Sequence, residues 1–204
     1  MKEMNRREFL TLSGAAVVAL SLAGCGGPSA PPAPPASESK EMALFKAINE
    51  VWYEVLRDPN PKLQICQSVA YCLEAADLAK FTASPFETHE PETDNGDFRS
   101  WNLSDAEFYE YKHREGEMIE EIGNIYGGGS YLGTAGVFNK THDGMLLEEP
   151  YPSNQSEVRE FVRRLAGGRT LASPHREQWM IGLYCPTIKG KTYTVAVMVR
   201  FSQF

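Results

Sequence analysis

The sequence predicts an α+β fold, a three-layer α-β-α sandwich with a central antiparallel sheet. Residues 193–201 alternate Tyr, Val, Val, Val and Phe with Thr, Ala, Met and Arg, which is the period of a β-strand. Both faces of this strand are largely apolar, because Ala196 and Met198 oppose the valines, so we expect it to be central and covered on both sides. Amphipathic helical patterns precede it, in the order helix, helix, loop, helix, strand, helix and hairpin.

The N-terminus has the pattern of an exported lipoprotein. Residues 5–10 read N-R-R-E-F-L, a twin-arginine export pattern, and an apolar run over residues 12–22 follows. This run is shorter than the ~20 apolar residues that a spanning helix needs, but it suits a signal peptide. Residues 22–25, L-A-G-C, resemble the bacterial lipobox, in which the cysteine is acylated and becomes the first mature residue. We therefore expect residues 1–24 to be a signal peptide, and acyl chains on Cys25 to anchor the protein to the extracytoplasmic face of the cell membrane.

Residues 25–40 are expected to form a tether. They are rich in proline, which favours an extended backbone of ~3.1 Å per residue and prevents a packed core. The remaining residues, 41–204, are enough for one domain with a sizeable core.

The charge of the chain argues against a nucleic-acid partner. Removing residues 1–24 takes three basic and two acidic groups from the totals of 20 and 27, which leaves 17 minus 25, or −8. Such a chain also lacks the basic excess needed to dock on anionic lipid, so membrane attachment should depend on acylation.

Three cysteines remain once Cys25 is assigned to lipid. An exported chain permits disulfides, and two interpretations stay open: a bridge from Cys185 to Cys66 or Cys72, or three buried free thiols. No C-x-x-C motif is present, so the sequence does not support a zinc ribbon or a thioredoxin-like site.

The first half of the domain predicts two helices and a long loop. Residues 41–57 place apolar side chains on one helical face, and the D-P-N-P sequence that follows ends the helix. Residues 63–81 predict an alanine-rich second helix with Leu73 and Ala76 on its apolar side. Residues 82–102 are polar and rich in turn-forming residues, so we expect a loop there.

The second half predicts two capped helices, a weak strand and the terminal hairpin. Ser104 and Glu107 form a capping-box pattern before a helix over residues 105–121. Residues 130–138 predict a weak strand and residues 139–154 a loop. Asn154 or Ser153 caps the next helix. The apolar face of this helix carries Val158, Phe161, Val162 and Leu165. The hairpin pairs residues 179–185 with the last strand through a Lys-Gly-Lys turn at residues 189–191.

Several of these segments resemble the CAP superfamily, which contains the cysteine-rich secretory, antigen-five and pathogenesis-related proteins and many bacterial SCP-like exported proteins. The S-P-H-R motif at residues 173–176, followed by Ile181-Gly182, a turn and a Y-x-V-x-V strand, is similar to the C-terminal half of a CAP domain. Residues 123–127, G-N-I-Y-G, resemble the family's G-E-N-I-x-x-G segment, with Gly123 at the position where the family has Glu. Ile48-Asn49 and the alanine-rich helix resemble its opening, and the resemblance implies the α-β-α sandwich.

The resemblance also implies a cleft with two histidines and two acidic residues, which in some members binds a divalent cation such as zinc. His175 matches the family motif, and the second imidazole would come from His113 or His89. The acids would come from Glu121, near Gly123, and Glu160. Each residue also has a structural interpretation: a framework histidine for His175, a loop residue for His89, and solvated helix surface for the other three.

Two functions are open. The first is a non-enzymatic CAP-domain lipoprotein that binds a small apolar ligand, an envelope component or a protein partner. The alternative is a metal-dependent cell-envelope hydrolase in which His175 and His113 help to hold a metal that polarises water. The sequence contains neither a G-x-S-x-G nor an H-E-x-x-H motif, and the family's Glu is replaced at Gly123, so we favour binding.

Overall fold

The computed structural model describes residues 38–56, 68–88, 92–94, 98–101, 103–127, 131–141, 144–166 and 177–202, all within the compact unit Glu38–Phe204. The expected signal peptide, nearly all of the expected tether and four of the singled-out side chains lie outside these residues: Cys25, Cys66, His89 and His175. Among the described helices, none has both the length and the apolar character needed to cross a bilayer.

The main sheet has four strands in the order β1-β7-β10-β4. The last strand, β10, pairs antiparallel with both β7 and β4, so the prediction of a central strand in a terminal hairpin is confirmed. The edge strand β1 pairs parallel with β7, so the sheet is not antiparallel throughout. The bounds of these strands are Ala70–Tyr71 for β1, Tyr131–Ala135 for β4, Glu177–Tyr184 for β7 and Val195–Ser202 for β10.

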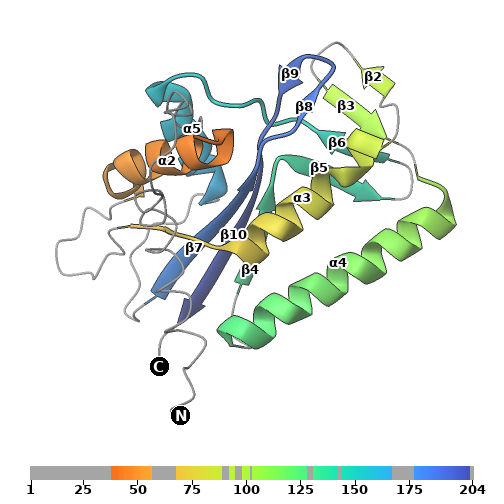
Figure 1. The fold of residues 1–204 in the computed structure, drawn as a ribbon, viewed down its shortest axis with the longest axis horizontal. Coiled ribbons are helices and arrows are strands. Elements are labelled where there is room, and N and C mark those ends of the chain that lie inside the picture. The colour runs from red at the N-terminus through yellow and green to blue at the C-terminus, as the bar shows by residue number, and fades with distance from the viewer. Residues whose placement is uncertain are drawn as a thin grey trace, which may run out of the picture. The chain divides into compact units, whose positions relative to one another are not determined.

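Alternate side chains of β10 enter two separate apolar cores. Its three valines pack in one core with α3 (Leu73–Thr88), and Ala196 and Met198 pack in the other with α2 (Lys40–Leu56) and α5 (Gln155–Leu165). Figure 1 shows the sheet between these helices, with α3 on one side and α2 and α5 on the other. The protein is therefore an α+β fold, as the sequence predicts.

The second helix, α3, differs from its sequence prediction at both ends. The pattern predicts a helix over residues 63–81, whereas α3 spans Leu73–Thr88 and Ala70–Tyr71 forms β1. Leu73 is 65% exposed, and the buried side instead carries alanines four residues apart at positions 75, 79 and 83. The helix continues through Pro85, which has no N–H to donate to the Phe81 carbonyl one turn earlier. The Ser84 Oγ donates to this carbonyl instead, at 2.7 Å.

A helix of 22 residues, α4 (Asp105–Tyr126), covers the outer side of α3 (Figure 1). Its capping box forms as predicted, with the Glu107 N–H donating to Ser104 and the Ser104 N–H donating to Glu107. The helix continues five residues beyond the predicted end at residue 121, and Gly123 lies inside it. The segment that resembles G-E-N-I is thus helical up to Tyr126.

Two of the predicted loops contain strands, so these loop predictions are wrong. A second sheet has the order β2-β3-β6-β5, from the segments Glu92–Asp94, Phe98–Trp101, Gly144–Leu147 and Val137–Thr141. β3 pairs with β6 more than forty residues later, with Trp101 opposite Met145. Short strands of this kind depend on a distant partner, so their own residues carry a weak signal.

The Lys-Gly-Lys turn forms as predicted. It closes a two-stranded hairpin of β8 (Thr187–Ile188) and β9 (Lys191–Thr192), which lies between β7 and β10 in the sequence. Lys189 and Gly190 have φ values of 47° and 80°, and positive values at both central positions are typical of tight hairpin turns. Gly190 adopts this conformation without the steric cost that a side chain would add.

Candidate functional site

His113 lies on the outer surface of α4. Its side chain is 65% exposed, and its Nδ1 lies 3.6 Å from the Glu117 carboxylate one turn further along the helix. The Arg114 guanidinium also contacts this carboxylate at 2.7 Å, and the hydrogen bond from Arg114 holds the pKa of Glu117 below its ordinary value. The described residues around the adjoining hollow, Tyr109, Glu110, His113, Arg114 and Glu117, all come from α4. This arrangement is an exposed side of one helix.

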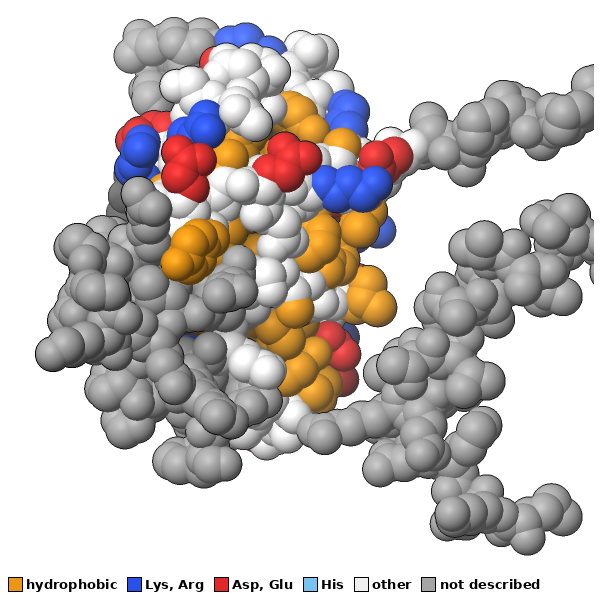
Figure 2. All heavy atoms as spheres, turned by 90° about the vertical axis from the view of Figure 1, so that its left-hand side faces the viewer, with side chains coloured by type: hydrophobic (Ala, Val, Ile, Leu, Met, Phe, Trp, Pro, Cys, Tyr) orange, Lys and Arg blue, Asp and Glu red, His pale blue; other side chains and the backbone are white. Residues whose placement is uncertain are grey.

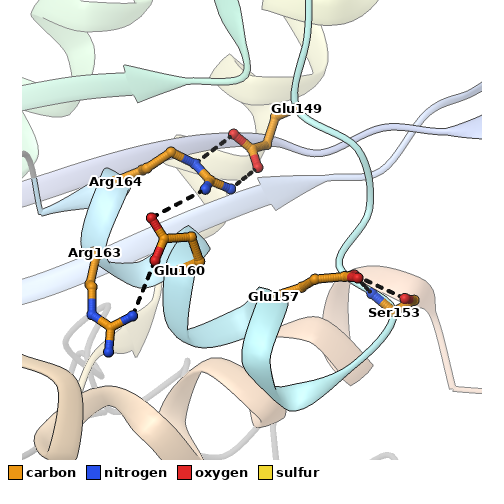
Figure 3. A network of polar contacts seen from close by, with 6 residues as sticks. All are labelled: Glu149, Ser153, Glu157, Glu160, Arg163 and Arg164. Atoms are coloured by element: carbon orange, nitrogen blue, oxygen red, sulfur yellow. Dashed lines mark hydrogen bonds and ion pairs between the residues drawn. The ribbon is translucent and has the colours of Figure 1, made fainter. Parts of the chain in front are cut away.

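Glu121 and Glu160 lie on different helices. Glu121 is exposed on α4. Glu160 is on α5, where it contacts Arg163 at 3.1 Å and Arg164 at 3.7 Å (Figure 3). Because α4 packs in the core on the α3 side of the sheet and α5 in the core on the opposite side, the structure does not bring Glu160 together with His113.

The described residues contain no group of three or more His, Cys, Asp or Glu side chains placed to hold a metal ion. His175 and His89 lie outside this part of the chain. The two described cysteines, Cys72 and Cys185, are both buried free thiols, so the structure supports the free-thiol interpretation for these two. Burial, followed by the negative charge of Glu41, raises the pKa of Cys185 to about 12.

A buried carboxylate that the sequence analysis did not identify joins α5 to the rest of the domain. Glu149 is 8% exposed, and its carboxylate accepts hydrogen bonds from Nε and Nη2 of Arg164, as Figure 3 shows. The backbone carbonyl of Glu149 also accepts from the Thr194 N–H at 2.8 Å, just before β10. This two-pronged ion pair therefore holds α5 close to the sheet. In the sequence, nothing distinguishes Glu149 from its neighbour Glu148.

The start of α5 is held by a second polar group. The Ser153 N–H and hydroxyl donate to Glu157 at 2.7 and 2.9 Å (Figure 3), and the Asn154 side chain accepts from the Glu157 N–H at 3.0 Å. These hydrogen bonds hold the pKa of Glu157 below its ordinary value, and the bond from the Ser153 N–H has the largest effect. The predicted cap at Asn154 is confirmed, and Glu157 has a structural role at the helix start.

An aromatic cluster lies on the α2 side of the sheet near the beginning of β7. Trp52 and Trp179 pack edge to face, with ring centroids 5.9 Å apart, and the Arg200 guanidinium lies 5.7 Å from the Trp179 ring. Trp179 is four residues after His175 in the sequence. The cluster therefore packs the beginning of β7 against α2.

The outer surface on the α2 side mixes apolar and charged side chains (Figure 2). On α2, Met42 is 36% and Tyr53 43% exposed. Charged side chains on and beside this helix form opposite-charge pairs, Lys46 with Glu38 at 2.6 Å and Arg159 with Glu54 at 3.2 Å. Such pairing does not create a strong field of one sign on this described surface.

Comparisons of the chain with protein-family models, with curated proteins and with solved structures return no match. A functional proposal therefore depends on the residues and the fold of the chain itself.

Proposed function

We propose that this protein is a lipid-anchored lipoprotein with a CAP-type α-β-α sandwich, which binds a small apolar ligand, an envelope component or a protein partner outside the cell membrane. Its anchor would be the acylated Cys25, followed by the proline-rich tether. Binding, and not catalysis, is the activity that we assign to the domain.

The observation that carries the proposal is the contact between two segments that separately resemble CAP motifs. Gly182 belongs to the Ile-Gly pair after S-P-H-R, and Ala75 begins the A-x-x-x-A spacing of the alanine-rich helix. A Cβ added at Gly182 would lie 2.0 Å from the carbonyl carbon of Ala75, so the helix backbone lies directly against β7 at this glycine. Only glycine leaves room for this close approach of the helix backbone to the strand, so the two segments that resemble CAP motifs depend on each other for packing.

The order of elements gives further support. Helices lie on both sides of a sheet whose central strand is β10, and the S-P-H-R motif comes directly before its neighbour β7. The order of the layers agrees with the α-β-α sandwich that a CAP resemblance implies, although the parallel pairing of β1 with β7 departs from a wholly antiparallel sheet.

The contacts of two described candidate residues, Glu160 and His113, favour binding over hydrolysis. Glu160 contacts two arginines, and the exposed His113 contacts Glu117 of its own helix. The family's Glu is replaced at Gly123. A hydrolase would need His175 and partners that these contacts do not provide.

The anchor is tested by partition of the expressed protein between detergent and aqueous phases, with mass measurement of the N-terminal peptide. We expect the wild type in the detergent phase with an acylated Cys25, and the Cys25→Ser variant in the aqueous phase. An unacylated wild-type protein in the aqueous phase would refute the anchor.

Binding and hydrolysis are separated by zinc calorimetry and by mass spectrometry of molecules that copurify with the mature protein. We expect a copurifying ligand, no stoichiometric zinc binding, and reduced ligand retention in His175→Ala. The matched control is His113→Ala, because His113 is exposed on a single helix and should not affect retention. Stoichiometric zinc binding that His175→Ala abolishes would favour the hydrolase.

A further inference from the structure

We propose that α4 opens away from α3 as a unit, and that the hydrogen bond between Tyr126 and Glu74 is the latch that keeps it closed. Opening would expose the thiol of Cys72. This property belongs to the fold and does not depend on the proposed function.

The first argument is that little apolar surface holds α4. Only three of its 22 residues are buried, Tyr111, Glu115 and Ile122, and one of these is a carboxylate, while its other apolar contacts with the core come from partly buried side chains: Phe108, Met118 and Tyr126. Glu115 forms an ion pair with Lys112 of the same helix, a contact that would move with α4. Because the free energy of local opening depends on the buried apolar contacts that are lost, this helix should open more easily than the domain unfolds.

The second argument concerns two specific contacts of α4 with α3, one in each half of α4. In its first half, the Tyr111 ring stacks on Phe81 with centroids 5.1 Å apart and the planes 11° from parallel. At the C-terminal end, the Tyr126 hydroxyl donates to Glu74 Oε2 at 2.9 Å. The helix ends there at Gly127, whose φ of 97° is accessible mainly to glycine. A break at the Tyr126 end would leave α4 held by this stack and by the packing of Phe108, Met118 and Ile122 against the core that contains α3.

The third argument concerns what the latch covers. The Cys72 Sγ lies 3.4 Å from Glu74 Oε2 and 3.6 Å from the Tyr126 hydroxyl, and Cys72 is 1% exposed. Burial raises the pKa of this thiol, which keeps it protonated and unreactive in the closed state. Movement of Tyr126 would uncover the sulfur, so the reactivity of Cys72 reports the opening of α4.

Cys185 provides an internal reference. It is 6% exposed and lies in the core on the opposite side of the sheet from Cys72. Opening of α4 leaves this core intact, whereas global unfolding exposes both thiols.

The test measures alkylation rates of the two thiols in the full chain carrying Cys25→Ser and Cys66→Ser, which leaves Cys72 and Cys185 as the only cysteines. Peptide mass spectrometry under native conditions gives each rate separately. We expect Cys72 to react faster than Cys185. Tyr126→Phe should raise the Cys72 rate about tenfold, as expected for the loss of a hydrogen bond to a charged group, without changing that of Cys185.

The matched control is Tyr109→Phe, which removes a hydroxyl from the same helix at a residue that is 75% exposed. It should change neither rate. Equal rates for the two thiols in the wild type would show that they become accessible only by global unfolding and would overturn the proposal. An unchanged Cys72 rate in Tyr126→Phe would overturn the role of the latch.

Discussion

Replacement of Gly182 by alanine tests the close contact between β7 and α3. The added Cβ would lie 2.0 Å from both the Ala75 carbonyl carbon and the Ala76 nitrogen, and 2.6 Å from the Ala75 oxygen. All three atoms are backbone, so no side-chain rotation can relieve the clash. The helix must move outward by about 1 Å or more to restore ordinary contact distances.

The cost of this movement can be estimated from the packing that it disturbs. Five side chains of α3 are 2% exposed or less in the core that contains the β10 valines: Ala75, Leu78, Ala79, Ala83 and Phe86. Overpacking of a core commonly costs about 1–3 kcal/mol. Because the clash is with backbone, we expect the free energy of unfolding to fall by about 3 kcal/mol, which lowers the Tm of a domain of this size by about 6–12 °C.

Urea unfolding followed by circular dichroism measures this change in free energy. The matched controls are Gly116→Ala and Gly123→Ala, since a Cβ added at either position in α4 meets no atom within 4 Å. Both should stabilise the protein by about 0.5–1 kcal/mol through helix propensity. Neutral surface substitutions change the free energy of unfolding by no more than about 0.5 kcal/mol. If the unfolding free energy of Gly182→Ala differs from that of the wild type by less than about this amount, the proposed contact is wrong.

Three further changes test individual polar contacts. Arg164→Ala leaves Glu149 buried without its ion-pair partner and should cost about 1–3 kcal/mol in urea unfolding, whereas the exposed Arg163→Ala should cost less than about 0.5 kcal/mol. Equal costs would show that the buried pair adds nothing. Ser104→Ala removes the capping box and should lower the unfolding free energy by about 1 kcal/mol, a result that an unchanged urea midpoint would contradict. Burial alone would raise the pKa of Glu74, but the hydrogen bonds that its carboxylate accepts lower this pKa below its ordinary value. The ionised carboxylate therefore stabilises the folded protein at neutral pH, and this stabilisation is lost as the pH falls through the folded-state pKa. The stability difference between wild type and Glu74→Gln should therefore shrink in acid, and a constant difference from pH 7 to pH 3 would exclude this contribution.

Features that depend on neighbouring residues could be predicted from the sequence. The capping box at Ser104 and the turn at Lys189-Gly190 each result from the conformational preferences of a few adjacent residues. The alternation along β10 predicted its central position, because both sets of side chains are apolar and each set needs its own core.

Features that depend on distant segments could not be predicted in this way. β3 and β6 are each only four residues long, and each is a strand because it pairs with the other. The sequence predicts Leu73 on the buried side of α3, yet the close approach at Gly182 selects the alanine face instead. The pattern within one helix does not contain this information.

The candidate site shows the same division. The sequence alone identifies imidazoles and carboxylates as chemical candidates and places His113 and Glu160 on helices. Only the tertiary structure puts those two helices on opposite sides of the sheet and joins Glu149 to Arg164. Local preferences depend on adjacent residues, whereas the distance between side chains far apart in the chain depends on how all the layers pack together.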